Sequence, residues 1–525
     1  MAPRSRGFLS RAARALLTGF VAAGIWVSCG GDSGGLIGDP DLGVLVELEL
    51  MPRSVTIVVG ANRRFVALGR YSTGATESVD VAWSATGGMV AADGNYAAGV
   101  VPGTFSVVAT ASSGLSDTAQ VVIANPPPTN GVTDITRLPA ATGQHPNVAA
   151  WNALDVPGLQ AGGSYLDPTT GVRVWKLTSP TVPQPNDGAG HDYGDGPVQV
   201  SREWGGGKHT VLVRVGDLGY WLVDLERGVG LSNWRRMPSG AAPGGDLHWS
   251  FSKNPLTPQI AYSFTGNQLV RVNTATGTVE NTGNFPVTLP AGTWLQQDQF
   301  DEWFVKLSGS SQVVAWNSGT NQVITQSLDG LDEPHLEGHG RYVAMITEGG
   351  ARIWDLQTNT VSDSGWRVWT FHHNASMLGH WISVHVDGPV FNFRLEPAGD
   401  DDPVGVNIFE PGMATYQHGA GQWVQPDVPE DEQYAVISSY GNLANGGEIW
   451  TGALLKAAIG FLRSDGGDAR LLAHAYVVYD NGDYWELPKA TPSPDGKVVI
   501  FDSDMQNSGR YDLFLVEVPV DPDGE

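Results

Sequence analysis

Cysteine is almost missing from this sequence, and basic residues are scarce. Cys29 is the only cysteine among 525 residues, which excludes an intrachain disulfide and a cysteine-based zinc site. The chain has 30 Lys and Arg residues against 55 Asp and Glu, a formal net charge of −25 at pH 7. Binding to nucleic acid needs basic residues that displace counterions from phosphates, so this chain is not expected to bind DNA or RNA.

Long hydrophobic runs are also lacking, except at the start of the chain. No later apolar run approaches the ~20 residues of a membrane-spanning helix. Four arginines lie within the first 14 residues and are followed by an apolar run over residues 15–27, which is the pattern of an export signal. Without this segment the chain keeps 26 of its 30 basic residues and all 55 acidic ones, so contact with anionic lipid is disfavoured.

The end of this apolar run resembles the bacterial lipobox. Val27-Ser28-Cys29 is followed by a run of Gly, Asp and Ser, and in the lipobox such a cysteine is acylated before cleavage. Trp26 departs from the aliphatic residue usual at its position, and ordinary secretion with an incidental cysteine is the alternative. The resemblance implies a signal peptide over residues 1–28, a flexible tether over 29–43 and lipidation at Cys29. The product would be an exported lipoprotein, periplasmic or at the cell surface, that meets the membrane only through its lipid anchor.

The remaining composition predicts an all-β fold. The chain has 68 Gly, 33 Pro and 18 Trp residues, a mixture of turn formers and aromatics typical of many short strands. Residues 44–124 show period-2 alternation, as in Val55, Ile57 and Val59, which places one face of each strand in a core. Turn sequences separate these runs, and Trp83 is expected as the central core aromatic of a small sandwich.

The order of motifs in residues 44–124 resembles the bacterial Ig-like group 2 (Big-2) domain. The Trp83 strand, the Asn95-Tyr96 pair and Pro102-Gly103-Thr104-Phe105 follow in that family's order. The resemblance implies an Ig-like β-sandwich that serves as a spacer or adhesion module. Residues 125–134, with three consecutive prolines, are expected to form an extended linker.

Residues 135–525 contain recurring pairs of short strands, which predict a β-propeller. The segments "TVLVRVGDLGYWLVDLERG" and "YVAMITEGGARIWDLQTNT" are examples. Seven blades are predicted, and the strand within residues 164–179 is expected to close the ring by joining the last blade. Seven positions are taken to precede the inner strands: His191, His248, Gln299, His335, His373, His418 and the segment 488–493.

The histidines are the most informative chemical feature. All 12 lie at or after His145, and several stand near predicted inner strands, whose ends converge on the axis of a propeller. Neutral imidazoles gathered there could hold a divalent metal, with carboxylates such as Glu333 orienting the rings. The alternative is that each histidine bonds to a neighbouring blade and only locks the ring. His339 and His474 are expected in loops.

"YLDPTTGVRVWKLTS", a histidine-containing loop and "YWELPKATPSPDGKVVIFDSD" resemble propellers of the oligogalacturonate-lyase type and their TolB-like relatives. This resemblance implies a divalent metal (Mn, Zn or Ca) and β-elimination on a uronate. The residues that it implies are the metal ligands His335, His373, Gln417 and His418 and a catalytic base at His191 or His248. The ligand spacing of that family is not reproduced around Gln417-His418, and no arginine that would clamp an acidic sugar is identified.

Aromatic residues near the predicted axis offer stacking surfaces for sugar rings. Trp249, Tyr416, Trp423 and Trp485 are the candidates, with packing between blades as the alternative role. Two functions therefore remain open. The first is a surface-displayed propeller that binds a glycan or an extracellular protein, with the Ig-like domain as its stalk. The second is a metal-assisted polysaccharide lyase. The incomplete ligand pattern and the acidic charge favour the first.

Overall fold

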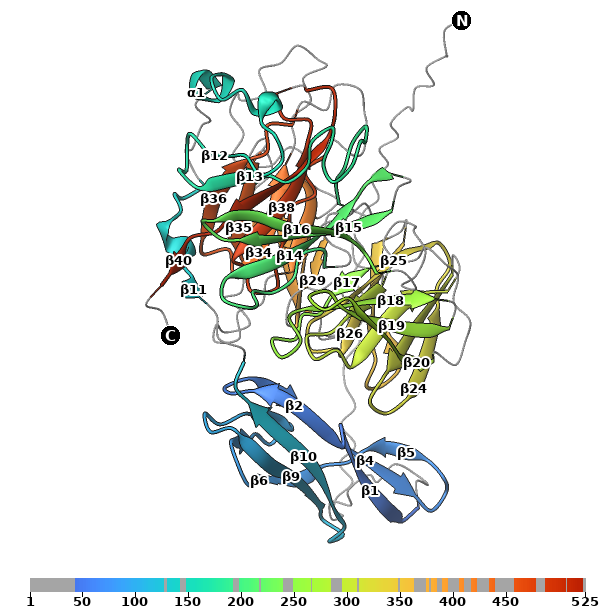
Figure 1. Cartoon of the computed structure of the whole chain (residues 1–525). Helices are drawn as coiled ribbons and strands as arrows, with labels where there is room; N and C mark the ends of the chain where they lie inside the picture. Colours follow the sequence, from blue (N-terminus) through green and yellow to red (C-terminus); the bar gives the residue numbers. More distant parts are fainter. Residues whose placement is uncertain are drawn as a thin grey trace, which may run out of the picture.

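The structure is a computed structural model. It describes residues 43–126, 130–141, 148–191, 198–216, 219–238, 249–265, 267–284, 295–308, 311–347, 350–362, 374–376, 379–384, 390–394, 406–409, 417–422, 434–439, 458–477, 487–506 and 508–522. Two units follow one another along the chain (Figure 1): residues 45–124, here the N-terminal unit, and residues 130–522, here the body. Among these residues no helix is long and apolar enough to cross a membrane.

Two sheets and a ribbon form the N-terminal unit, with a hydrophobic core between the sheets. One sheet contains β1 (Leu45–Met51), β4 (Val66–Tyr71) and β5 (Thr76–Ser78). The other contains, in spatial order, β2 (Ser54–Val58), β10 (Ser116–Ala124), β9 (Gly103–Ala111) and β6 (Val81–Ala85). The ribbon contains β3 (Asn62–Arg64), β8 (Asn95–Ala97) and β7 (Met89–Val90).

The predicted alternation is confirmed in this unit, but the predicted central aromatic is wrong. Val55 and Ile57 are buried on one face of β2. Phe65 and Tyr96 are the buried aromatics, packed edge to face with their ring centroids 6.0 Å apart. Trp83 is only half-buried against this core, because its strand β6 is the edge of its sheet and has one neighbouring strand instead of two.

The described part of the body contains seven larger sheets, which follow one another in chain order. The first sheet contains β14 (Lys208–Arg214), β15 (Tyr220–Glu226) and β16 (Gly230–Arg236), and the second contains β17 (Ser250–Phe251), β18 (Ile260–Thr265), β19 (Gln268–Asn273) and β20 (Thr278–Asn284). The third sheet contains β21 (Leu295–Gln297), β22 (Trp303–Leu307), β23 (Gln312–Asn317) and β24 (Gln322–Ser327), and the fourth contains β25 (Leu331–Leu336), β26 (Tyr342–Thr347), β27 (Gly350–Asp355) and β28 (Thr360–Val361). The fifth sheet contains β29 (Asn374–Ser376), β30 (His380–Val384), β31 (Val390–Arg394) and β32 (Val406–Phe409), and the sixth contains β33 (Gln417–Gln422), β34 (Tyr434–Ser439), β35 (Ala458–Arg463) and β36 (Ala469–His474). Antiparallel neighbours within each sheet match the hairpins expected from the sequence.

The seventh sheet combines the two ends of the body. Its order is β12 (Ser164–Leu166), β13 (Arg173–Lys176), β39 (Asp512–Glu517), β38 (Val498–Ser503) and β37 (Thr491–Pro492). β13 pairs with β39 through Val174 and Val516, so the prediction that residues 164–179 join the last sheet is confirmed. A second pairing, between β11 (Val132–Thr133) and β40 (Val520–Asp521), ties the same two ends together.

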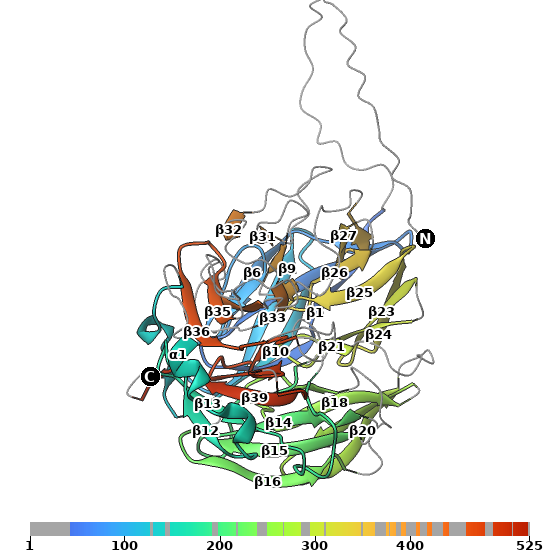
Figure 2. The same ribbon diagram turned by 90° about the horizontal axis from the view of Figure 1, so that it is seen from above.

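The sheets follow one another around a ring, as in a β-propeller (Figure 2), and apolar clusters of described residues join six of the seven neighbouring pairs. The clusters lie between the first and second, second and third, third and fourth, fourth and fifth, and sixth and seventh sheets. β29 of the fifth sheet lies beside β33 of the sixth. The cluster that closes the ring packs Val211 and Val223 of the first sheet against Val498 and Leu513 of the seventh. The short helices η1 (Ile135–Arg137), α1 (Val148–Asn152) and η2 (Val156–Gly158) precede β12.

A buried polar residue directly follows the innermost strand in four of the seven sheets and accepts a hydrogen bond from the backbone of the next turn. Examples are Asn254 N–H to Ser252 Oγ at 3.0 Å and Arg341 N–H to Glu337 Oε1 at 2.7 Å. In the first sheet Ser201, next to the bridge between Val200 and Val211, instead accepts from the Thr210 N–H of β14 at 2.8 Å. The four turn-capping residues are Ser252, Asp298, Glu337 and Ser493, and they and Ser201 are fully buried. Gln299, expected before an inner strand, instead lies in the turn after β21. The turns after the innermost strands all belong to one face of the ring, here the turn face.

Candidate functional site

His335 is the one predicted metal ligand whose side chain is described. It lies near the end of β25 and is fully buried. Its Nε2 is 3.1 Å from Glu333 Oε1, and its Nδ1 is 3.4 Å from Gln296 Nε2 on the neighbouring innermost strand. The Glu333 carboxylate therefore lies beside this ring, within ion-pair distance of it. Among the described residues no group of three or more His, Cys, Asp and Glu side chains could hold a metal ion.

The strand register separates His335 from Gln417 along the ring axis. Leu336 and Gln422 each pair with the second residue of the next strand, Val343 and Ala435 respectively. Beyond that common level His335 pairs with Ala344 and Gln417 with Ser439, so Gln417 lies three residues further along the partner strand, on the order of 10 Å at ~3.3 Å per residue. His418 follows Gln417 in β33. The third predicted ligand strand is β29, but His373 lies outside the described residues.

His191, a candidate base, connects the seventh sheet to the start of the first. Its ring is fully buried, with Nδ1 3.1 Å from Asp502 Oδ1 and Nε2 2.6 Å from the carbonyl oxygen of Lys489. The same Asp502 pairs with Lys489 Nζ at 3.0 Å, and both side chains are fully buried. Both ring nitrogens of His191 face oxygen acceptors, so these contacts fit the ring-locking role. The other candidate base, His248, lies outside the described residues.

Of the four aromatic residues predicted to stack on sugar rings, Trp249 is the one that lies among the described residues. Its side chain is 2% exposed and packs in the cluster between the first two sheets with Leu212 and Phe251, which fits the alternative role of core packing. Tyr416, Trp423, Trp485 and the lipidation candidate Cys29 lie outside the described residues. His474, expected in a loop, instead ends β36, where it is buried and its Nδ1 lies 3.3 Å from Asp167 Oδ2.

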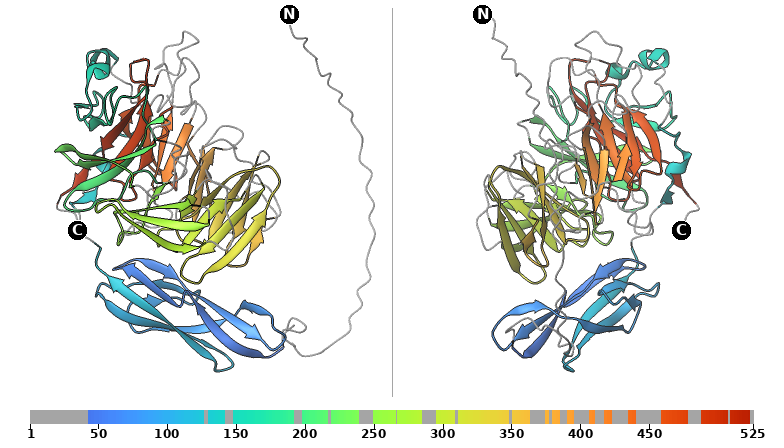
Figure 3. Two further views of the ribbon diagram at one scale, coloured as in Figure 1. Left: turned by 45° about the vertical axis from the view of Figure 1, so that its right-hand side comes forward. Right: turned by 180° about the vertical axis from the view of Figure 1, so that it is seen from behind.

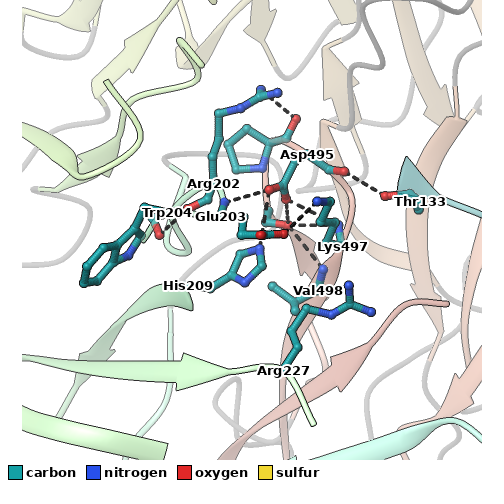
Figure 4. A network of polar contacts seen from close by, with 12 residues as sticks. Thr133, Arg202, Glu203, Trp204, His209, Arg227, Asp495, Lys497 and Val498 are labelled. Atoms are coloured by element: carbon teal, nitrogen blue, oxygen red, sulfur yellow. Dashed lines mark hydrogen bonds and ion pairs between the residues drawn. The ribbon is translucent and has the colours of Figure 1, made fainter. Parts of the chain in front are cut away.

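A buried polar network on the turn face was not anticipated from the sequence (Figure 4). Asp495 Oδ2 accepts from the Glu203 N–H at 2.7 Å and lies 3.4 Å from His209 Nε2. Burial opposes the ionisation of Asp495, but the nearby charges of His209 and Arg202 and the Ser493 hydroxyl hold its pKa below the ordinary value. Glu203 also pairs with Lys497 Nζ at 2.6 Å. The network therefore joins the seventh sheet to the first.

This network also holds the chain that arrives from the N-terminal unit. The Asn130 N–H donates to Glu203 Oε1 at 2.6 Å, and Lys497 Nζ donates to the Asn130 carbonyl at 3.4 Å. Thr133 Oγ1 donates to the Asp495 carbonyl at 3.0 Å. The end of the linker is thus fixed to the turn face.

A second contact with the N-terminal unit lies in the turn between β21 and β22. Arg63 of β3 forms an ion pair with Glu302, and its guanidinium carbon lies 4.4 Å from the centre of the Phe300 ring. Asp298 organises this turn, because its Oδ1 accepts from the N–H groups of Phe300 and Glu302 at 3.1 and 2.9 Å. Burial, then the nearby charge of Glu302, raises the pKa of Asp298 to about 7. Burial raises the pKa of Asp301 to about 6.

No protein-family model matches this sequence, and no curated protein matches it. Among solved structures, the chain is similar to an oligogalacturonate lyase from Vibrio parahaemolyticus, with 12% identity and a TM-score of 0.45 over 68% of this chain and 96% of that one. It is similar to an oligogalacturonate lyase in complex with manganese, with 14% identity and a TM-score of 0.43 over 69% and 99% of the two chains. It is also similar to U3-55K, with 11% identity and a TM-score of 0.36 over 59% and 91%.

Proposed function

We propose that this chain is an exported, lipid-anchored protein whose Ig-like domain carries a seven-bladed propeller, and that the propeller binds a glycan. The seven sheets joined in a ring and the two-sheet core of residues 45–124 support these two domain assignments. An exported protein is the other partner predicted from the sequence. The acidic composition still argues against nucleic acid as a ligand.

The observation that carries this proposal is the position of the N-terminal unit. The chain that arrives from this unit is held at Asn130 by Glu203, and the unit itself contacts Glu302 through Arg63; both acidic residues lie in turns on the turn face. The face on which the innermost strands begin is therefore turned away from the stalk, and Gln417 and His418 open β33 on that side. A stalk on one face and a ligand on the other is the arrangement expected of a displayed binding domain.

A glycan array tests this proposal. We expect the Cys29→Ser protein to bind a defined glycan, and Gln417→Ala/His418→Ala to weaken the Kd at least tenfold. The matched control is Gln322→Ala, an exposed position on the outermost strand β24, which should leave the Kd unchanged. Failure of the unaltered protein to bind any glycan, or an equal loss in the control, would contradict the proposal.

The lipid anchor is tested separately. Cells fed a labelled fatty acid should label the unaltered chain in their membrane fraction, whereas Cys29→Ser should release an unlabelled protein. A Cys29→Ser protein that stays in the membrane would contradict lipidation at this residue.

A metal-assisted lyase is the second proposal, because three successive innermost strands, β25, β29 and β33, contain or adjoin the predicted ligands. The manganese complex among the similar structures is a property of that protein. The described residues of this chain do not assemble a metal site by themselves, so no catalytic step is derived through one. Manganese bound stoichiometrically and lost in His335→Ala/His418→Ala, together with an unsaturated product from oligogalacturonate, would support the lyase. Metal-free protein without such a product would exclude it.

A further inference from the structure

We infer that the N-terminal unit is a fixed cap on the turn face of the body, held there by Arg63 as the counter-ion of the acidic turn Asp298–Glu302. This inference does not depend on the ligand of the body, because it concerns only how the two units are joined. It assigns to the Ig-like domain a role beyond that of a free spacer.

The first argument is the burial of the contact. Arg63 is 7% exposed, and it is the only buried charged side chain in residues 45–124, a stretch that the structure describes completely. Its partner Glu302 lies in the body, 239 residues away in sequence. Phe300 of the same turn packs against the hydrophobic core of the N-terminal unit. A guanidinium on an aromatic face combined with an ion pair is directional and specific.

The second argument is charge balance. The turn contributes three carboxylates, and Asp298 Oδ2 and Asp301 Oδ1 are buried without a hydrogen-bond partner among the described residues. Burial raises the pKa of Glu302, and the charge of Arg63 opposes that rise. Two cations of the body lie near this turn: Lys253, 8% exposed, is within electrostatic range of Asp298 and Asp301, and Arg271 is within range of Asp301. Arg63 thus adds a positive charge where the body carries an excess of negative charge.

The third argument is the position of the two attachments. Arg63 contacts the third sheet, whereas Asn130 is held by Glu203 and Lys497 at the junction of the seventh and first sheets. The two attachments therefore lie on different sides of the ring. In Figure 2 the blue strands of the N-terminal unit are seen behind the middle of the ring. Both views of Figure 3 show the unit against the same face of the body. The unit consequently spans the turn face, and a ligand of the ring has to approach from the opposite face.

Spin-label distances test this inference. In a Cys29→Ser background, labels are attached to Met89→Cys and Leu166→Cys, whose native side chains are 76% and 53% exposed in the N-terminal unit and in β12. A fixed cap predicts one narrow distance distribution. Arg63→Glu should replace it with a broad distribution, and Arg63→Glu/Glu302→Arg should restore most of the narrow peak. Arg70→Glu, which alters an exposed pair with Glu47 in the same unit, should leave it unchanged.

A broad distribution in the parent protein would overturn the inference, as would a narrow one that survives Arg63→Glu. If Arg63→Glu fails to fold, as judged by circular dichroism, the milder Arg63→Gln replaces it, and an unchanged narrow peak in that variant counts equally against the inference. If the charge swap folds but does not restore the peak, the contact is not a specific ion pair and the assignment of Arg63 as counter-ion falls.

Discussion

The two units of this molecule bury different kinds of side chains. The core of the N-terminal unit is apolar, and its single buried charge, Arg63, faces the other unit. The body buries whole ion pairs: Lys489 with Asp502, Lys176 with Asp512 and Lys497 with Glu203, none of them more than 4% exposed. Two sheets that face each other can be held by apolar contact alone, whereas sheets around a ring also meet at strand ends, where backbone groups have to be satisfied.

The difference predicts that the body depends on single polar side chains more than the N-terminal unit does. A buried ion pair adds little net stability when it is compared with an apolar replacement, but removal of one partner leaves an uncompensated charge. The apolar core loses stability in proportion to the volume removed. The following measurements test that contrast, from the largest expected effect to the smallest.

Asp502→Ala should give the largest loss. It leaves Lys489 without its ion-pair partner and His191 without the carboxylate that its backbone N–H and Nδ1 contact. We expect the free energy of unfolding of the body to fall by about 3–5 kcal/mol, measured by guanidinium unfolding with tryptophan fluorescence. Gln322→Ala, at an exposed site on β24, is the control and should change it by less than ~0.5 kcal/mol. A loss below ~1 kcal/mol for Asp502→Ala would contradict this reading of the pair.

Leu50→Ala should give the next largest loss, confined to the other unit. Leu50 is fully buried in the apolar core, so its truncation should cost about 3 kcal/mol through lost burial and the cavity left behind. Hydrogen exchange followed by mass spectrometry on peptides from β9 and β10 measures this loss. Peptides from β38 and β39 are the internal control, and if they lose protection to the same extent, the two units do not unfold separately.

The free energy of unfolding of the body should depend on pH, because two carboxyl groups in the β21–β22 turn, those of Asp298 and Asp301, have raised pKa values. A carboxyl group whose folded pKa is raised contributes stability that is complete below the unfolded pKa of ~4 and lost as pH rises through the folded value. With folded values of about 7 for Asp298 and about 6 for Asp301, the free energy of unfolding should fall by about 1–3 kcal/mol between pH 5 and pH 8.

Asp298→Asn separates this turn from other titrating groups. The asparagine keeps an oxygen acceptor for the N–H groups of Phe300 and Glu302 but cannot ionise, so the decline with pH should become shallower than in the parent protein. Identical pH profiles of the two proteins would show that Asp298 does not titrate in this range.

Arg70→Ala should have the smallest effect. Arg70 and Glu47 form an ion pair in the N-terminal unit with both side chains more than half exposed, and such pairs contribute about 0–1 kcal/mol. We expect a change below ~0.5 kcal/mol, measured by the same hydrogen-exchange experiment. A loss comparable to that of Leu50→Ala would mean that surface charge stabilises this unit as strongly as its core.

Much of the fold could be predicted because its signals are local. Alternation within four to seven residues defines hairpins such as β14–β15 and β26–β27, and the valine-rich run around Val174 identified the strand that joins the last sheet. The closure of a ring is a general property of such repeats, so the sequence-distant partner of this strand could be inferred from the pattern alone.

The polar contacts could not be predicted, because their partners are far apart in sequence and chemically unlike one another. Arg63 looks like an ordinary strand residue until the turn at Glu302 is placed beside it. Ser252, Asp298 and Glu337 occupy equivalent turn-capping positions, but a hydroxyl and two carboxylates of different length show no sequence repeat. His474 ends β36 instead of lying in a loop, and its partner Asp167 is 307 residues earlier in the chain.

The pairing of β13 with β39 also constrains the order in which the chain can fold. Residues 45–124 contain all the strands of their own sheets, so this part can fold as soon as it has been synthesised. The last sheet of the body needs Val174 and Val516 together, and domains generally fold as units from the N-terminal end during synthesis. The ring therefore cannot close before Val516 is available, and until then the body exposes open sheet edges that another chain could bind.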